Sequence, residues 1–197
     1  MSAILLSGRN EGIKERQALV RMFQGNALEM EEKMEFRPAR ETDIDDICDL
    51  VASAIAHMRE QKIFQWDEKY PTRVDFLDDL RENTLFVGTI EGKLAVTFTV
   101  NQTCDPEYDD GDWQYPDEEY RIIHRLCVNP TFQGRGVAGC TLRHIEEELR
   151  RQGIGAVRLD SFTQNPTAVA LYTKNGYERT GFADWRMGRF WLMEKRL

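Results

Sequence analysis

A glycine-rich turn is the segment of the sequence whose residue types most clearly suit a chemical task. It runs through Gln133, Gly134, Arg135, Gly136, Val137, Ala138 and Gly139. Glycine lets the backbone approach an anion closely, and the free N–H groups at the start of a helix add the positive end of its dipole. We therefore expect the backbone of this turn to hold a pyrophosphate.

The same turn matches the dinucleotide pattern G-x-G-x-x-G, and Asp160 follows at about the 20-residue spacing of that motif's acid. Three features count against this interpretation. Residues 129–133 separate Val128 from the first glycine, whereas the dinucleotide motif joins its strand to the glycine almost directly. Too little chain follows Gly139 for the rest of a doubly wound sheet, and hairpins and loops join the preceding strands. These features favour another phosphate-bearing ligand.

The elements that must position this turn follow from hydrophobic periodicity and from capping residues. Expected strands cover residues 34–38, 85–90, 94–100, 121–128, 156–162, 177–182 and 189–194. Expected helices begin at a Thr42 cap, at a Thr72 cap, after the glycine turn and at Asn165, and a hairpin turn lies at 91–93. The order β-α-α-β-β-β-α-β-α-β-β predicts an α/β (α+β) fold. Residues 1–33 form an expected N-terminal extension, helical or partly ordered, to a domain at 34–197.

Several segments together resemble the GNAT acetyltransferase superfamily. Gln133–Ala138 is similar to its Q/R-x-x-G-x-G/A signature, and Asn165–Tyr177 is similar to its N-x-x-A-x-x-L-Y-x-x-x-G-F/Y segment. Ile123–Pro130 resembles the fourth strand of the family, and Phe36–Ala39 a common opening. The resemblance covers residues 34–197. It implies a mixed, mostly antiparallel central sheet flanked by helices.

The resemblance also implies a function. Such a protein transfers an acetyl group from acetyl-CoA to a primary amine by direct attack in a ternary complex, with no metal. The acceptor is a small molecule or a peptide amine, and acetylation of a protein N-terminus or lysine stays open as an alternative. So does a non-catalytic module that only binds acyl-CoA. The oligomeric state is undecided, with a homodimer as one option.

Cofactor contacts are expected along one path through the chain. The N–H groups of residues 133–139 would hold the pyrophosphate of acetyl-CoA. By resemblance, the backbone of Leu126, Cys127 and Val128 would flank the thioester and pantetheine arm, and Asn165 would lie near the pantetheine. Backbone N–H near Val128 would polarise the thioester carbonyl.

Tyr172 is the candidate acid, since a phenol stays protonated at neutral pH and can donate to a leaving thiolate. Its alternative role is packing beside Leu171. Some relatives carry a glutamate base where this chain has Ile122. His124 lies two residues further on, projects from the same strand face and is the candidate base. Ordinary packing of His124, acids of the loop at 104–120, or no base at all are the alternatives.

Two further hypotheses concern nucleophile and acceptor. Cys127 could carry an acyl intermediate, but the sequence places no histidine and acid to activate it, so direct transfer is favoured.

Trp66, Asp67 and Tyr70 fall between the first two helices, in the region that forms the wall of the acceptor site in related folds. Trp66 and Tyr70 are the candidate substrate contacts, and a simple capping cluster is the alternative.

Charge excludes several classes of partner. The net charge is −8, with 26 basic and 34 acidic residues, which disfavours nucleic acid and anionic membranes. The acidity is concentrated between Cys104 and Tyr120, which contains no Lys or Arg. One hypothesis is that this loop attracts a cationic amine to the acceptor entrance; the alternative is a solvated, flexible loop.

The cysteine spacing and the length of the apolar runs indicate the cellular compartment. Cys48, Cys104, Cys127 and Cys140 are scattered without a C-x-x-C pair, so reduced thiols are expected and neither zinc nor a disulfide framework is. No apolar run reaches the length of a signal or membrane segment. We expect a cytoplasmic protein.

Overall fold

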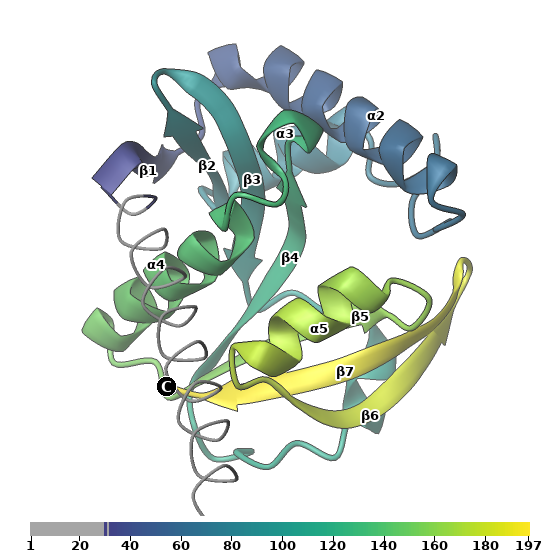
Figure 1. Cartoon of the computed structure of the whole chain (residues 1–197). Coiled ribbons are helices and arrows are strands. Elements are labelled where there is room, and N and C mark those ends of the chain that lie inside the picture. Colours follow the sequence, from purple (N-terminus) through teal and green to yellow (C-terminus); the bar gives the residue numbers. More distant parts are fainter. Residues whose placement is uncertain (1–29, 31) are drawn as a thin grey trace, which may run out of the picture.

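The computed structural model describes residue 30 and residues 32–197, so the expectation for the extension at 1–33 lies almost wholly outside the described residues. The central feature is a seven-stranded sheet in the order β1-β2-β3-β4-β5-β7-β6 (Figure 1). Its strands are β1 (Met34–Pro38), β2 (Leu85–Ile90), β3 (Lys93–Asn101), β4 (Tyr120–Val128), β5 (Ala156–Phe162), β6 (Glu178–Trp185) and β7 (Gly188–Arg196). Only β4 and β5 pair in parallel; every other pair is antiparallel. The expected fold class is confirmed.

Helices cover both faces of this sheet. They are α2 (Ile44–Glu60), α3 (Arg73–Arg81), α4 (Val137–Arg151) and α5 (Pro166–Lys174). One buried cluster joins α2 and α3 to β2, and another joins α4 and α5 to the strands from β3 to β7. In Figure 1, α4 and α5 lie in front of the sheet. Burial of these apolar stripes contributes on the order of 1.5–3 kcal/mol per large side chain and fixes the helices on the sheet.

Local signals placed most element ends to within one or two residues, although β6 runs to Trp185 and not to 182. Thr72 caps α3 in a capping box with Asp75, and Asn165 caps α5 by accepting a hydrogen bond from the Ala168 N–H at 3.1 Å. The Thr42 cap was wrong. A short 3-10 helix (Glu41–Asp43) precedes α2, and Asp43 accepts from the Arg40 N–H at 2.7 Å, so the carboxylate satisfies the orphan donor instead.

The parallel pair β4–β5 separates halfway along its length. Pairing runs from Tyr120 with Ala156 to Ile123 with Leu159 and then stops. At the same place β4 bulges: Thr97 and Thr99 of β3 face Cys127 and His124, which leaves Arg125 and Leu126 opposite a single residue. Arg125 has φ of 50°, a left-handed conformation that a bulge accommodates. The bulge and the separation together open the sheet at the C-terminal half of β4.

Candidate active site

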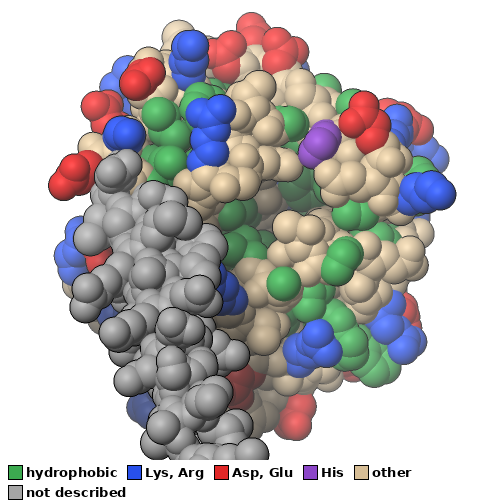
Figure 2. Space-filling model, in the orientation of Figure 1, with side chains coloured by type: hydrophobic (Ala, Val, Ile, Leu, Met, Phe, Trp, Pro, Cys, Tyr) green, Lys and Arg blue, Asp and Glu red, His purple; other side chains and the backbone are tan. Residues whose placement is uncertain are grey.

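A cavity of about 640 Å³ lies where β4 and β5 separate. Its wall comes from α3, the α2–α3 connection, the ends of β4 and β5, the start of the acidic loop, α5 and the β6–β7 turn. Figure 2 shows the surface hollowed between the part of the molecule that carries α2 and the part that carries α5, with hydrophobic side chains at the bottom. A volume of this size suits a small-molecule site.

The cavity brings together residues that the sequence analysis chose separately. Trp66, Tyr70, His124, Leu126 and Tyr172 all line it. Cys127, Val128 and Asn165 do not, and neither does the glycine turn, which follows β4 and leads into α4. The expected acid, base and substrate contacts thus share one cavity with Leu126, while the other expected cofactor contacts do not line it. Which of them contact a ligand stays a prediction.

The glycine turn has the backbone form that anion binding requires. Gly134 and Gly136 have φ of 74° and 86°, and a Cβ at either position would meet nothing within 4 Å. The first hydrogen bond of α4 runs from the Cys140 N–H to the Gly136 carbonyl at 3.0 Å. The N–H groups of residues 137–139, in the first turn of α4, therefore have no acceptor within the helix, and they cluster at its N-terminus directly after the two glycines.

Tyr172 projects from α5 and is 8% exposed. Its ring packs edge-on against Tyr177, with ring centroids 5.8 Å apart, and this contact fixes its orientation. Burial, with a smaller contribution from the charge of Asp160, raises the pKa of the Tyr172 phenol above its ordinary value of 10. The phenol is thus fully protonated at neutral pH and able to donate a hydrogen bond into the cavity.

Asp160, on β5, has the spacing of the acid in the dinucleotide pattern, and the GNAT resemblance gives it no role. It lines the same cavity as Tyr172 and accepts a hydrogen bond from the Tyr108 hydroxyl at 2.8 Å. Burial raises the pKa of its carboxyl to about 6, and the nearby carboxylate of Asp105 adds to the shift. A carboxylate with this pKa is ionised at neutral pH and still basic enough to accept a proton.

His124 lies on the cavity wall with a different environment. Burial, and then the charge of Arg125, lower its pKa to about 4, against a hydrogen bond with the backbone of Thr103 that raises it. Its Nε2 is buried and has no hydrogen-bond partner among the described residues. The imidazole is neutral at physiological pH, but it is a weaker base than Asp160. The stronger candidate base therefore comes from β5 and not from β4.

A hydrogen-bond network joins the bulge of β4 to the acceptor wall. Arg125 donates to both carboxylate oxygens of Asp79 and, at 2.9 Å, to the hydroxyl of Tyr70. Thr99 Oγ1 donates to Asp79 at 2.7 Å. Asp79 lies on α3 and Tyr70 on the α2–α3 connection, so one guanidinium ties both to the sheet. This network holds Tyr70 at the cavity.

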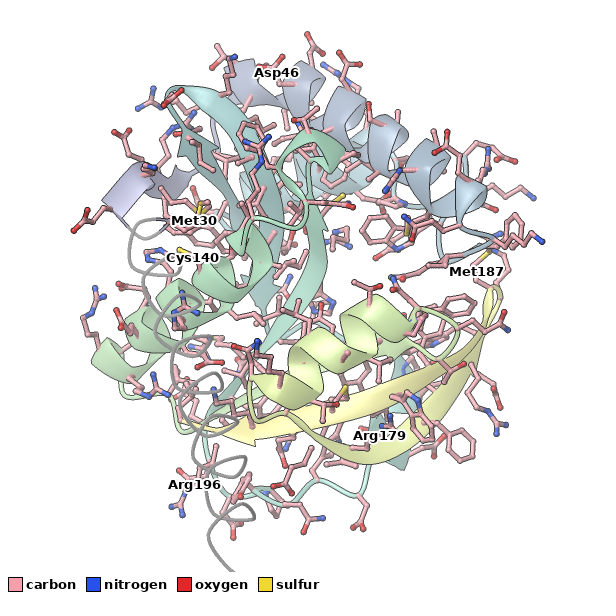
Figure 3. The ribbon with its side chains drawn as sticks, viewed as in Figure 1. Met30, Asp46, Cys140, Arg179, Met187 and Arg196 are labelled. Carbon is pink, nitrogen blue, oxygen red and sulfur yellow. The ribbon has the colours of Figure 1, made fainter. Side chains whose placement is uncertain are left out.

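A second contact joins the two rims of the cavity. The guanidinium of Arg186, in the β6–β7 turn, donates to both oxygens of Asp67 at 2.6 and 2.8 Å. Met187 in the same turn packs against the buried cluster of Ile63, Phe162 and Phe190, and Figure 3 shows it at the tip of the hairpin beside the end of α2. The α2–α3 connection and the β6–β7 turn are thereby held together over the site.

Cys127 has no features of a nucleophile. It is 4% exposed, and burial alone raises the pKa of its thiol to about 12, so the thiolate is scarce at neutral pH. It does not line the cavity. The four cysteines are free thiols in the structure, and the described residues contain no cluster of His, Cys, Asp and Glu that could hold a metal.

Comparison with known proteins agrees with this geometry. A family model described as the acetyltransferase (GNAT) family matches residues 44–177. The chain belongs to this GNAT family. The GNAT domain is also similar to the crystal structure of a GNAT-family acetyltransferase from Streptococcus agalactiae, with 28% identity, a TM-score of 0.75 and coverage of 83% of this chain and 95% of that one. The resemblance in the motifs is thus confirmed.

Two further similarities concern ligands. The PaiA N-acetyltransferase of Thermoplasma acidophilum, solved with coenzyme A, shares the fold with a TM-score of 0.63 and 16% identity, over 83% of this chain and 99% of that one. The [ribosomal protein bS18]-alanine N-acetyltransferase of Escherichia coli K12 is 27% identical over 115 residues, or 58% of this chain and 65% of the relative. This chain spans 17% to 65% of the length of the curated relatives that it matches in sequence.

No helix within the described part of this GNAT domain is long and apolar enough to cross a membrane.

The acidic loop at 104–120 lies in a more specific place than its composition indicated. Only its first part, with Cys104, Asp105 and Tyr108, lines the cavity. Further along, Gln114 N–H donates to Glu194 of β7 at 2.7 Å, and Glu118 pairs with Arg196. Most of the loop therefore covers the sheet away from the cavity.

Proposed function

We propose that this GNAT domain is an N-acetyltransferase that moves an acetyl group from acetyl-CoA to a primary amine by direct attack in a ternary complex. The observation that carries the proposal is the meeting of Tyr172 and Asp160 in one cavity, where the sheet opens beside a free α4 N-terminus. A candidate proton donor and a candidate proton acceptor in one site are typical of an enzyme and not of a binding module.

The N–H groups of residues 134–139 would hold the pyrophosphate, and the cofactor arm would run between the separated strands. Beyond Ile123, β4 has no strand partner on its β5 side, so its backbone is free to meet the pantetheine and the thioester carbonyl. The residues present thus fit acetyl-CoA. Polarisation of the carbonyl by a preorganised backbone donor lowers the barrier to attack.

The proton balance closes within the cavity. The nitrogen of the neutral amine forms a bond to the carbonyl carbon, and the carbon–sulfur bond then breaks. Asp160 takes the proton that the nitrogen loses, directly or through water, and Tyr172 gives a proton to the departing thiolate. To restore both groups after the transfer, Asp160 loses its gained proton and the phenolate of Tyr172 regains one, in each case by exchange with water. An acceptor that arrives as an ammonium ion releases one more proton to solvent.

The test is CoA release from acetyl-CoA over a panel of amines, with wild type, Asp160→Asn and Tyr172→Phe. Each variant should lower kcat by about 10²- to 10³-fold, since general acid–base catalysis contributes 10²- to 10⁴-fold. Asp160→Asn should also remove the rise of activity through pH 6. The His124→Gln variant serves as the comparison for the base. A collapse of activity in His124→Gln with Asp160→Asn unaffected would return the role to His124.

Acetylation of a protein N-terminus is the second candidate, favoured by the similarity to the bS18-alanine N-acetyltransferase. Peptides with a free N-terminal alanine separate the two, because a protein N-acetyltransferase prefers them over small amines. A third outcome is tight CoA binding without turnover of any amine or peptide. That result would identify a non-catalytic acyl-CoA module in which Tyr172 is structural.

A further inference from the structure

The charge of the cavity wall is strongly one-sided. Six carboxylates line the cavity, namely Asp75, Asp78, Asp79, Glu82, Asp105 and Asp160. The only cationic side chains among the described lining residues are Arg125 and Arg186, and each is already bound to a carboxylate, Asp79 and Asp67 respectively. The site thus presents excess negative charge to whatever enters it.

Four of these carboxylates share one stripe of α3 and its C-cap. Asp75, Asp78, Asp79 and Glu82 stand at positions i, i+3, i+4 and i+7, which lie on one face of a helix. Phe76, at the next position after Asp75, is 1% exposed and packs into the core instead. Asp75 caps the helix with Thr72 and Asp79 pairs with Arg125, so these two residues also serve the fold. Asp78 and Glu82 stand at i and i+4, where like charges destabilise a helix, and what the stripe faces explains them better.

Basic side chains of the described residues neutralise only part of the stripe. Asp79 is bound by Arg125, and Asp78 pairs with Arg81. Asp75 accepts only from the backbone and hydroxyl of Thr72, and Glu82 has no basic partner among the described residues. Across the cavity Asp105 lies close enough to Asp160 to oppose its ionisation. A cation bound between these walls would relieve repulsion on both sides.

We propose that the acceptor is a small aliphatic amine with a second positive charge. Its reacting nitrogen lies at Asp160 and its distal cation at the α3 stripe of Asp75, Asp78 and Glu82. A small acceptor fits better than a peptide, because the two rims of the cavity are joined by the ion pair of Asp67 with Arg186 and by the packing of Met187 against the cluster that contains Ile63. This inference rests on the proposed function and adds the substrate class to it.

The test uses three amines of equal length: 1,5-diaminopentane, hexylamine and 6-aminohexanoate. They differ only in a distal ammonium, methyl or carboxylate group. Wild type should prefer the diamine over hexylamine by at least about tenfold in kcat/KM and should use 6-aminohexanoate least. The preference should shrink with added salt, since solvent-exposed charges are screened. Equal kcat/KM for the diamine and hexylamine would overturn the inference and leave the proposed function standing.

Variants locate the effect on α3. In Asp78→Asn combined with Glu82→Gln, the ratio of kcat/KM for the diamine to that for hexylamine should fall about fivefold to tenfold. Glu178→Gln, on exposed β6 and away from the cavity, is the matched control and should keep the wild-type ratio. A ratio unchanged in the double variant would contradict a role for the stripe.

Failure of the proposed function is separable from failure of this inference. If no amine is acetylated, the function falls, and calorimetric binding of the same three amines to the CoA-loaded protein then decides the inference. Selective binding of the diamine supports it. Equal or absent binding overturns it.

Discussion

Two buried ion pairs each join an arginine to a carboxylate, but they have different roles in the molecule. Arg158 and Glu194 face each other across β5 and β7, with side chains 7% and 1% exposed. Arg125 and Asp79 join β4 to α3, with side chains 13% and 8% exposed. Both pairs are buried almost equally, so burial does not distinguish a structural pair from one at a functional site.

The difference lies in what surrounds each pair. Arg158 lies over the rings of Tyr120 and Trp113, and Glu194 also accepts the N–H groups of Gln114 and Tyr115, so protein groups enclose both charges. The pair of Arg125 and Asp79 opens on a cavity that contains a further carboxylate, Asp160. The first pair fastens the acidic loop to the sheet, and the second supports a site that is left electrically unbalanced.

The largest effect on stability should come from breaking the enclosed pair. Glu194→Gln leaves the charge of Arg158 buried without its partner and should lower the free energy of unfolding by about 3–5 kcal/mol. Urea unfolding measures it, with Glu35→Gln at an exposed position of the edge strand β1 as a control within about 0.5 kcal/mol. A loss as small as the control's would mean that the enclosed pair does not hold the loop.

The opposite sign is expected at the cavity. Burial raises the pKa of Asp160 to about 6, above its ordinary value of 3.8, so the charged form that predominates at neutral pH disfavours folding. Asp160→Asn should therefore raise the free energy of unfolding by about 1–3 kcal/mol while it lowers kcat.

The pH dependence of that gain provides the check. The gain should be nearly full at about pH 7, should shrink as the pH falls through 6, and should vanish below the ordinary value of 3.8, where the wild-type carboxyl is protonated in both states. Urea titrations of both proteins at about pH 3 and pH 7 measure it. Destabilisation of the variant at pH 7 would show that the carboxylate contributes to the fold, as Glu194 does.

The smallest effect is expected at the rim. The salt bridge of Asp67 with Arg186 is partly exposed to solvent, with the Arg186 side chain 50% and the Asp67 side chain 16% exposed, so Asp67→Asn should lower the free energy of unfolding only slightly. Its release should favour larger acceptors, and the ratio of kcat/KM for an alanine-terminated peptide to that for 1,5-diaminopentane should rise about twofold to threefold. No change in that ratio would remove the rim contact as a determinant of acceptor size.

Much of the fold followed from local sequence. The strands at 34–38, 85–90 and 156–162 occur with the predicted ends, and the Asn165 cap begins α5 as expected, because periodicity and capping act within a few residues. The prediction at Thr42 failed because the Asp43 carboxylate, one residue further on, satisfied the free backbone donor. Which of two neighbouring residues caps a helix depends on side-chain geometry, and the amino-acid sequence alone does not specify that geometry.

The candidate site was only partly predictable. Tyr172, His124, Trp66 and Tyr70 were chosen from motifs and position, and all four line the cavity. Asp160 was noticed only as the acid of a dinucleotide pattern. The available signal was weak, because the strand that contains Asp160 also carries Arg158 and Ser161. The acidic loop drew attention by its composition, whereas the charge on the cavity wall comes mainly from α3.

The sequence by itself therefore determined the family, the order of elements and the glycine turn, because each depends on residue types at fixed spacing along the chain. Only the tertiary structure decided that Asp160 meets Tyr172, that Arg125 ties Tyr70 to the sheet, and that the stripe of α3 faces the cavity. These depend on where β4 and β5 separate and on burial, which changes the pKa of a side chain through contacts with residues far away in the chain.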